Sequence, residues 1–268
     1  MHAKKSLGQN FLNHEASIQK IASCVDEYFT EGDLILEIGP GRGALTKELL
    51  KNKKKVLAVE ADGELVIHLS SLFKKEIASG DLILVHADIL AYDEELIREY
   101  ASRYHIVANI PYYITGAILR KFLSSTFAPI SMTLVMQKEV ADRIVMYDKK
   151  TSILALSVCA YATPLHQMTI PAAHFSPTPR VDSSVITLHS ISRDTFTDAS
   201  HEELFFQLVH AGFAHKRKYV IHNLKLYDTT YNWAEGLAVY GYSVQIRAED
   251  ISIAHWIDLA GQYKEAKV

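Results

Sequence analysis

The sequence predicts an α/β fold in which a mostly parallel, doubly wound sheet is followed by a small all-helical domain. Two observations carry this prediction. Short apolar runs, typical of buried strands, alternate with helical segments along the first part of the chain, as they do in βαβ units. After a polar connector near residues 192–199, the apolar periodicity becomes purely helical. We therefore place the two domains at residues 1–194 and 195–268.

The first domain is expected to begin with a short basic arm, residues 4–12, that leads into a helix over 15–28. Strands that run into helices follow, and the last strands lack long helices between them, which predicts an antiparallel edge of the sheet. The expected strands are 34–38, 55–60, 81–85, 105–108, 130–136, 157–162, 168–170 and 185–188, and the expected helices among them include 44–50, 93–104 and 137–143. In the second domain the expected helices are 202–213, 218–226, 233–240 and 251–261.

The composition indicates a soluble globular protein of the cytoplasm. The 268 residues are 49% hydrophobic and 22% charged, and no apolar run approaches the length of a membrane span or resembles a signal peptide. The two cysteines, Cys24 and Cys159, have no metal-like spacing, which favours a reducing compartment and no metal site. We expect a monomer, because no heptad pattern or large apolar patch is apparent.

The distribution of charge along the chain says more about possible ligands than the net charge does. A net charge of −3 does not favour a nucleic-acid ligand, but basic clusters occur at residues 51–55, 149–150 and 215–218. Each cluster alone is more simply a solvated helix end or loop. Residues 215–218 (His-Lys-Arg-Lys) are the most interesting, because they lie between two amphipathic helices.

The segment Asn109-Ile110-Pro111-Tyr112-Tyr113 is the strongest candidate for the chemistry. It follows an expected buried strand, and ligands of open α/β sheets bind at the carboxyl ends of such strands. Pro111 stiffens the turn and should leave the neighbouring carbonyls outside any helix, while Asn109 adds an amide oxygen. Hydrogen-bond acceptors beside the flat ring of Tyr112 describe a site for the exocyclic amine of a nucleobase.

A glycine-rich turn at residues 37–43 joins the first expected strand to a helix. Its spacing is neither that of a dinucleotide site nor that of a phosphate loop, so it suits a nucleoside cofactor without a pyrophosphate. Glu60 ends the next strand, where a carboxylate can accept both ribose hydroxyls, and Asp88 follows the third, where it can accept from an adenine amine. Each acid alone would more simply be a helix N-cap or a solvated strand end. Together with the glycine turn and Asn109, they indicate S-adenosylmethionine.

Seven motifs occur in one order along the chain. They are 9–12 (Gln-Asn-Phe-Leu), 37–43 (Glu-Ile-Gly-Pro-Gly-Arg-Gly), 59–62 (Val-Glu-Ala-Asp), Asp88, 109–112 (Asn-Ile-Pro-Tyr), 137–143 (Gln-Lys-Glu-Val-Ala-Asp-Arg) and 175–183 (Phe-Ser-Pro-Thr-Pro-Arg-Val-Asp-Ser). A chain with these motifs resembles the ribosomal RNA adenine N6,N6-dimethyltransferases, the KsgA group, which share their fold with the Erm resistance methyltransferases. The first and the last motif are the most specific, and the helical tail matches more loosely.

The resemblance implies a Rossmann-like class I methyltransferase sheet with a C-terminal helical RNA-binding domain. It implies that S-adenosylmethionine contacts Asn10, Leu12, Gly39, Glu60, Asp88 and Asn109. It also implies that Asn109, Pro111 and Tyr112 hold the target adenine while Phe175 stacks on its other side. The proline-rich segment around Phe175 is independently suited to present a ring outside a core, although an ordinary core aromatic is the alternative at that position.

The implied activity is the transfer of methyl groups to N6 of adenines in small-subunit ribosomal RNA, with two adjacent adenines each dimethylated in an immature small ribosomal subunit. The basic cluster at 215–218 would then contact RNA phosphates. Two alternatives stay open: an Erm-type enzyme that acts on large-subunit RNA, and a non-catalytic RNA-binding assembly factor. The glycine spacing disfavours a nicotinamide-dependent dehydrogenase. Residues 152–158 and 216–219 (Lys-Arg-Lys-Tyr for the usual Arg-Arg-Lys-Thr) depart from the family pattern.

Overall fold

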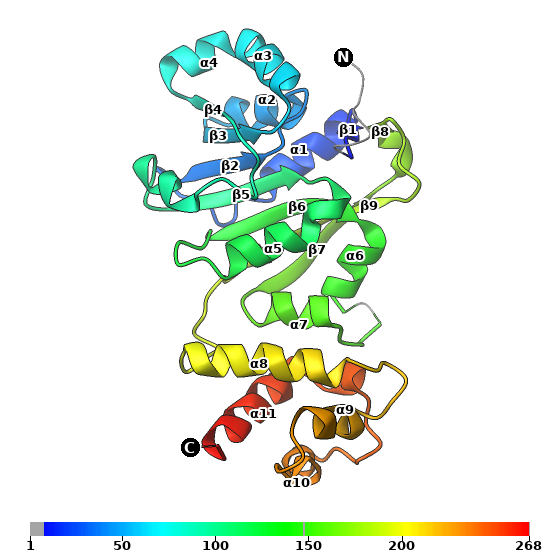
Figure 1. The fold of residues 1–268 in the computed structure, drawn as a ribbon. Coiled ribbons are helices and arrows are strands. Elements are labelled where there is room, and N and C mark those ends of the chain that lie inside the picture. Colours follow the sequence, from blue (N-terminus) through cyan, green and yellow to red (C-terminus); the bar gives the residue numbers. More distant parts are fainter. Residues whose placement is uncertain (1–7, 147, 268) are drawn as a thin grey trace. The chain divides into compact units, whose positions relative to one another are not determined.

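A seven-stranded sheet with the order β4-β3-β2-β5-β6-β9-β7 forms the centre of the N-terminal part of the chain (Figure 1). The strands β4, β3, β2, β5 and β6 pair in parallel, whereas β9 pairs antiparallel with both β6 and β7. The predicted antiparallel edge is therefore confirmed. In chain order the strands are β2 (Leu34–Ile38), β3 (Lys55–Glu60), β4 (Leu82–His86), β5 (Tyr104–Asn109), β6 (Ser131–Gln137), β7 (Thr163–Ile170) and β9 (Ser183–His189).

The structure is a computed structural model that describes residues 8–146 and 148–267. Residues 4–7 of the predicted basic arm lie outside the described residues. No helix in the described ranges is long and apolar enough to cross a membrane.

Buried helix faces cover the sheet. Ile21 of α1, Leu49 of α2 and Leu69 of α3 belong to one hydrophobic cluster with the strand residues Ile35 and Val107. The strands are apolar along most of their length, as expected for parallel strands buried on both faces. The helices of this part are α1 (Glu15–Ser23), α2 (Ala44–Lys51), α3 (Gly63–Leu72), α4 (Lys74–Ser79), α5 (Thr115–Leu123) and α6 (Lys138–Ile144).

The helix predicted over 93–104 is wrong in length and type. The structure has a short 3-10 helix, η2 (Glu94–Glu99), and Tyr104 already begins β5. Tyr104 is fully buried and its hydroxyl donates to the Phe127 carbonyl at 2.8 Å, so its side chain belongs to the sheet core rather than to a helix face.

A second, two-stranded sheet joins the N-terminal arm to the proline-rich loop. β1 (Phe11–Leu12) pairs antiparallel with β8 (Phe175–Ser176), so that Leu12 lies opposite Phe175. The Asn13 N–H continues this contact by donating to the His174 carbonyl at 2.9 Å. This pairing brings two distant motifs of the sequence together.

The segment 157–162, predicted as a strand, is not one: residues 157–159 end a helix, α7 (Ile153–Cys159), and residues 160–162 form the turn after it. Ser152 caps this helix by accepting a hydrogen bond from the Ala155 N–H at 3.1 Å. A short apolar run does not distinguish a buried strand from a buried helix, and here the serine cap and the leucines and alanines favour the helix.

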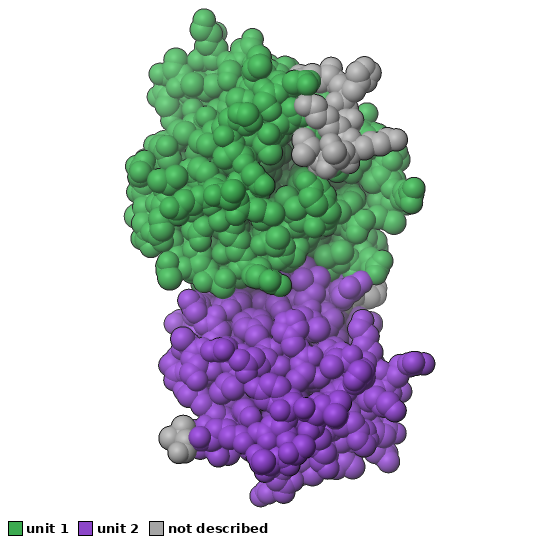
Figure 2. Space-filling view, viewed as in Figure 1, with its two compact units in different colours: residues 1–141, 163–191 green, residues 142–162, 192–268 purple. Residues whose placement is uncertain are grey.

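The chain forms two compact units, which Figure 2 shows in different colours. Unit 1 comprises Met1–Ala141 and Thr163–Ile191, and unit 2 comprises Asp142–Ala162 and Ser192–Val268. The boundary that the sequence predicts, after residue 194, lies close to the second crossing between the units, but residues 142–162 fall outside the predicted second domain. They belong to unit 2 because α7 packs against α8, and because the Thr151 hydroxyl donates to the Glu249 carbonyl at 3.1 Å.

Unit 2 is built from helices around aromatic side chains. Trp233, Trp256 and Phe205 are fully buried there. A Cβ atom on Gly212 would lie 2.4 Å from the Trp256 ring, so this glycine permits the close packing of its helix. The helical elements after the connector are α8 (Ala199–Gly212), α9 (Val220–Tyr227), α10 (Trp233–Ala238), η5 (Ala248–Asp250) and α11 (Ile253–Glu265).

Candidate active site

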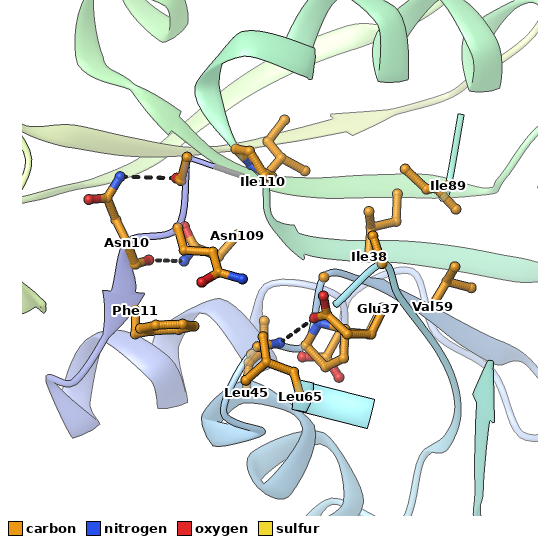
Figure 3. A pocket seen from close by; sticks show the side chains of 18 of the residues that line it. Asn10, Phe11, Glu37, Ile38, Leu45, Val59, Leu65, Ile89, Asn109 and Ile110 are labelled. Atoms are coloured by element: carbon orange, nitrogen blue, oxygen red, sulfur yellow. Dashed lines mark hydrogen bonds between the residues drawn. The ribbon is translucent and has the colours of Figure 1, made fainter. Parts of the chain in front are cut away.

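A cavity of about 270 Å³ lies in unit 1 at the carboxyl ends of the parallel strands (Figure 3). It is lined by β1, by the loop after β2, and by the segments that follow β3, β4 and β5. Its volume is just below the usual range for small-molecule sites, roughly 300–1,000 Å³. The predicted site residues that line it are Asn10, Leu12, Gly39, Glu60, Asp88, Asn109, Pro111 and Tyr112.

The glycine loop lets the backbone approach the cavity closely. Gly39 has a φ of +65°, and a Cβ built on it would meet no atom within 4 Å, so the space beside this residue is open. Its N–H donates to the Val59 carbonyl at 2.9 Å, which holds the loop against β3. Gly43 has a different role: a Cβ there would lie 2.6 Å from the Phe73 ring, so its absence allows α2 to pack.

Glu60 is a fixed acceptor at the end of β3. Its Oε2 accepts from the Gly41 N–H at 3.0 Å and its Oε1 from the Asp62 N–H at 2.9 Å. Burial raises the pKa of this carboxyl, and the two backbone N–H groups partly offset that effect. Each oxygen retains a lone pair, so the carboxylate is oriented but still able to accept from a ligand diol.

Glu37, in the middle of the sheet, lines the same cavity and was given no role by sequence reasoning. The side chain is fully buried, and burial raises its pKa to about 8, with contact to Thr46 lowering it and the charge of Glu60 raising it further. Its Oε2 has no hydrogen-bond partner of good geometry among the described residues. The sequence signal was available, since an acid inside an otherwise apolar strand is rare without a partner.

Asp88 lies at the cavity after β4. Its Oδ1 accepts from the Leu90 N–H at 2.9 Å, a turn-capping bond of the kind that the simpler alternative predicted. The side chain is exposed and lines the cavity with its remaining oxygen available to a donor.

The side chain of Asn109 is oriented by the N-terminal arm. Its Nδ2 donates to the Asn10 carbonyl at 3.0 Å, while the Asn10 Nδ2 donates to the Gly8 carbonyl at 3.3 Å (Figure 3). Only the nitrogen of the Asn109 amide can donate to a carbonyl, so this bond decides which way the amide points. The Oδ1 atom therefore remains as the acceptor that the side chain offers to the cavity.

Pro111 and Tyr112 form the rigid turn that follows. The Ile114 N–H donates to the Pro111 carbonyl at 3.1 Å and closes a 3-10 turn, η3 (Tyr112–Ile114). This differs from the expectation that the carbonyls beside Pro111 stay unused. The Tyr112 hydroxyl hydrogen-bonds to the Ser183 hydroxyl at 2.8 Å, which fixes the half-buried ring, and burial raises the pKa of this phenol.

Phe175 is not presented to the cavity, in contrast to the sequence expectation. Its side chain is 3% exposed and belongs to the core cluster with Leu12, Ile18 and Ile21. The physical reason is the pairing of β1 with β8, which covers the ring. Phe175 is therefore an ordinary core aromatic, which is the alternative that the sequence left open.

Phe11 and Arg42 are cavity residues that sequence reasoning left without a role. The Arg42 guanidinium lies 4.4 Å from the centroid of the Phe11 ring, and a Cβ on Gly41 would lie 3.1 Å from the same ring. An aromatic between Asn10 and Leu12 was a usable signal, because both neighbours were already candidates.

These residues fit S-adenosylmethionine. The open space beside Gly39 can accept a ligand without a steric clash, and the oriented carboxylate of Glu60 suits a ribose diol. The unpartnered buried oxygen of Glu37 favours a ligand with a polar group that can hydrogen-bond to it. Apolar side chains suited to an adenine ring complete the lining; they include Ile38, Leu45, Val59, Leu65 and Ile89.

The comparisons with known proteins agree with this geometry. A family model described as ribosomal RNA adenine dimethylase matches residues 1–262. The chain is 36% identical to the ribosomal RNA small subunit methyltransferase A of Dehalococcoides mccartyi strain CBDB1 over 274 aligned residues, which cover 98% of this chain and 89% of that protein.

Two solved structures share the fold. A dimethyladenosine transferase from Plasmodium falciparum aligns with a TM-score of 0.76 at 19% identity, covering 96% of this chain and 98% of that one. The 23S rRNA methyltransferase ErmE aligns with a TM-score of 0.75 at 23% identity, covering 95% and 100%. The predicted Rossmann-like class I methyltransferase sheet with a helical C-terminal part is thereby confirmed.

Proposed function

Since the chain belongs to the ribosomal RNA adenine dimethylase family, we propose that it transfers methyl groups from S-adenosylmethionine to N6 of adenines in small-subunit ribosomal RNA. The chain is an S-adenosylmethionine-dependent methyltransferase of ribosomal RNA. The proposal concerns the substrate and the residues that act on it. The target is two adjacent adenines, each dimethylated, in an immature small subunit, and the enzyme acts as a monomer in the cytoplasm.

The observation that carries the proposal is the hydrogen bond from Asn109 Nδ2 to the Asn10 carbonyl. It holds an amide acceptor beside a cavity whose other residues suit a nucleoside. Such an acceptor recognises an amino group, which adenine carries at the position that the family methylates.

The cofactor, when bound, supplies an electrophilic methyl group. Glu60 would accept hydrogen bonds from its ribose hydroxyls, and Asp88 would accept from its adenine amine. The cofactor could approach the backbone at Gly39 closely, because no side chain stands in the way there. Since the Glu60 carboxylate is oriented by two backbone N–H groups, binding costs little rearrangement of this residue.

The target amine needs positioning more than it needs a base. The lone pair of an adenine amine is delocalised into the ring, and its proton becomes acidic only after the methyl group has moved. Asn109 Oδ1 accepts one amino hydrogen and turns the nitrogen toward the incoming methyl. Positioning of this kind lowers a barrier by several kcal/mol, roughly 7–11 at the upper end.

Tyr112 provides the stacking surface for the target base. Its ring is held by the hydroxyl contact to Ser183, so little side-chain freedom is lost when a base binds. Stacking of this kind contributes roughly 1–3 kcal/mol per base and offsets the cost of unstacking the base from the RNA. Phe175 would have to leave the core to stack on the other side, and we assign it a supporting role beneath β1.

The experiment is the transfer of labelled methyl from S-adenosylmethionine to immature small ribosomal subunits, with large-subunit RNA in parallel, followed by nucleoside analysis. We expect N6,N6-dimethyladenosine in the small-subunit RNA alone. Label in the large-subunit RNA would replace the proposal by an Erm-type activity. Cofactor binding without label in either RNA would contradict the proposed substrate and favour an assembly factor.

A further inference from the structure

The loop between α8 and α9 in unit 2 carries an unusual concentration of positive charge. From residue 204 to residue 227 the sequence contains four Lys or Arg and three His but no Asp or Glu. Lys216, Arg217 and Lys218 are exposed, and within the described ranges none of them has an ion-pair partner. The next acid, Asp228, is bound to Lys267 at 2.5 Å, so it does not neutralise this loop.

Hydrogen bonds hold the backbone of this loop in place. Asn223, which is 2% exposed, donates from its Nδ2 to the Gly212 carbonyl at 2.6 Å and to the His215 carbonyl at 3.3 Å. The Lys218 N–H donates to the same His215 carbonyl at 2.9 Å. The Val220 N–H, just after the loop, donates to the Ile246 carbonyl at 2.9 Å. The three cations are therefore attached to a backbone that is fixed at both ends.

An exposed aromatic pair lies directly beside these cations. Tyr219 is 39% exposed, and its ring lies 6.1 Å from the ring of exposed His222 with an angle of 27° between the planes. Tyr227, at the other end of α9, is similarly exposed at 38%, but its hydroxyl donates to Gln207. The tyrosines at the two ends of α9 thus differ in their neighbours: only Tyr219, the N-cap residue, adjoins the cationic loop.

We propose that Tyr219 and His222 form a stacking site for one unpaired base of the RNA, whose neighbouring phosphates contact Lys216, Arg217 and Lys218 as the family resemblance implies for this basic cluster. The inference rests on the proposed function in one respect, that the substrate is RNA. It adds a site outside the methyl-transfer cavity and names its ligand, a single-stranded nucleotide.

The chemistry favours an unpaired base over a duplex or a protein. Cations without acidic partners attract a polyanion, and every nucleobase has a π face that can stack on an aromatic ring. In a duplex that face is covered by neighbouring base pairs, so an exposed ring is of use only to a single strand or a bulge.

The test compares the affinity of the full chain for a short single-stranded RNA and for a duplex of the same length. Tyr219→Ala should weaken single-strand binding about tenfold and leave duplex binding within about twofold, since stacking contributes only to the former. Tyr219→Phe should retain most of the affinity, because the ring and not the hydroxyl is needed. Tyr227→Ala, at the other end of α9, is the control and should bind as the wild type does.

Two further readouts separate stacking from a loss of structure. The slope of log K against log salt concentration should be unchanged in Tyr219→Ala, whereas Lys216→Ala should reduce it by about 0.7, the value for one phosphate contact to a single strand. The fluorescence of a 2-aminopurine base in the RNA should be quenched by the wild type and by Tyr219→Phe but not by Tyr219→Ala.

The outcomes distinguish this inference from the proposed function. If the wild type binds and methylates small-subunit RNA while Tyr219→Ala binds single strands equally tightly, the inference fails and the proposed function stands. Unchanged RNA affinity with weaker binding to the whole particle would assign the surface to a protein partner and overturn the inference. A wild type that neither binds nor methylates RNA would overturn both.

Discussion

At the scale of single residues, Asn109 connects two distant parts of the chain. Its amide is oriented by the carbonyl of Asn10, 99 residues earlier, and this bond leaves one oxygen for a ligand. The side chain therefore acts through geometry rather than through a shifted pKa, because an amide does not titrate.

Replacing Asn109 by alanine should lower the rate of methyl transfer by roughly 10²–10³-fold, the usual cost of removing one positioned polar group from an active site. The melting temperature should change little, since Asn109 is only part-buried. Single-turnover methylation and a thermal melt measure the two quantities.

The variant Asn109→Asp retains an oxygen but cannot donate to Asn10, so it should also be impaired. Asn52→Ala, at the exposed end of α2, is the control. Turnover close to that of the wild type in Asn109→Ala would contradict the proposed mechanism.

Glu37 is the second residue whose chemistry is set by its surroundings. Its pKa in the folded protein is raised to about 8 from an ordinary value of 4.5, mainly by burial. The folded state therefore holds a proton that the unfolded state releases. Its contribution to stability is fully present below pH 4.5 and is lost as the pH rises through 8.

The variant Glu37→Gln should remove this pH dependence. Between pH 4.5 and 8, the free energy of unfolding of the wild type should fall relative to that of the variant by up to about 1.4 kcal/mol per pH unit. Urea unfolding of the cofactor-free protein at several pH values measures this difference. Glu31→Gln, at an exposed position, is the control, and a flat difference curve for Glu37→Gln would refute the assignment.

At the scale of elements, two glycines of the loop between β2 and α2 have different roles. Gly39 and Gly43 both have positive φ, +65° and +80°, yet only the space beside Gly39 is open to the cavity. Gly39 therefore leaves space for a ligand, whereas Gly43 allows α2 to pack on Phe73.

Alanine substitutions should separate these two roles. Gly39→Ala should cost about 1–2 kcal/mol of stability from its positive φ and should weaken cofactor binding more than tenfold, because the Cβ enters the cavity. Gly43→Ala should cost more stability, because its Cβ also meets the Phe73 ring.

The control for the glycine pair is Gly80→Ala, which has a φ of +82° and open space away from the cavity. This variant measures only the loss of stability that comes from placing a Cβ atom on a residue with positive φ. Calorimetry of S-adenosylmethionine binding and thermal melts provide the measurements, and equal loss of affinity in Gly39→Ala and Gly80→Ala would remove Gly39 from the cofactor site.

Two other elements show how pairing decides the role of a residue. β1 and β8 are each two residues long, yet their pairing places Phe175 in the core. Helix α7 is inserted in the sequence between strands of unit 1, but it packs with α8 in unit 2. In both cases the partner of the element, rather than its own sequence, determines what it does.

At the scale of the whole molecule, a net charge of −3 coexists with an RNA substrate because the charge is unevenly distributed. The cations of residues 215–218 have no acidic neighbour in the sequence from 204 to 227. Average charge is thus a poor guide to this ligand, whereas local charge is informative.

RNA affinity should fall steeply with added salt. The triple variant Lys216→Ala, Arg217→Ala, Lys218→Ala should reduce the magnitude of the slope of log K against log salt by about 2, as expected when three phosphate contacts to single-stranded RNA are lost. Titrations at several salt concentrations measure the slope. Replacement of Lys51, Lys53 and Lys55 in unit 1 is the control, and an equal effect of that triple variant would mean that the attraction is not local to unit 2.

The sequence by itself determined the alternating strands and helices, the antiparallel edge, the glycine loop and the acids at strand ends. These features are local: an apolar run bounded by turns, or an acid just after it, is decided within a few residues. It also indicated the cofactor, since the ends of parallel strands meet at one edge of a sheet.

Only the tertiary structure decided the rest. The orientation of the Asn109 amide, the burial of Phe175 and the membership of residues 142–162 in unit 2 depend on contacts between segments far apart in the chain. The apolar run of α7 alone does not decide between a buried strand and a buried helix, and the local signal for the helix is the Ser152 cap. The Asn109 amide, Phe175 and residues 142–162 have no such local signal, because their states depend on partners far away in the sequence.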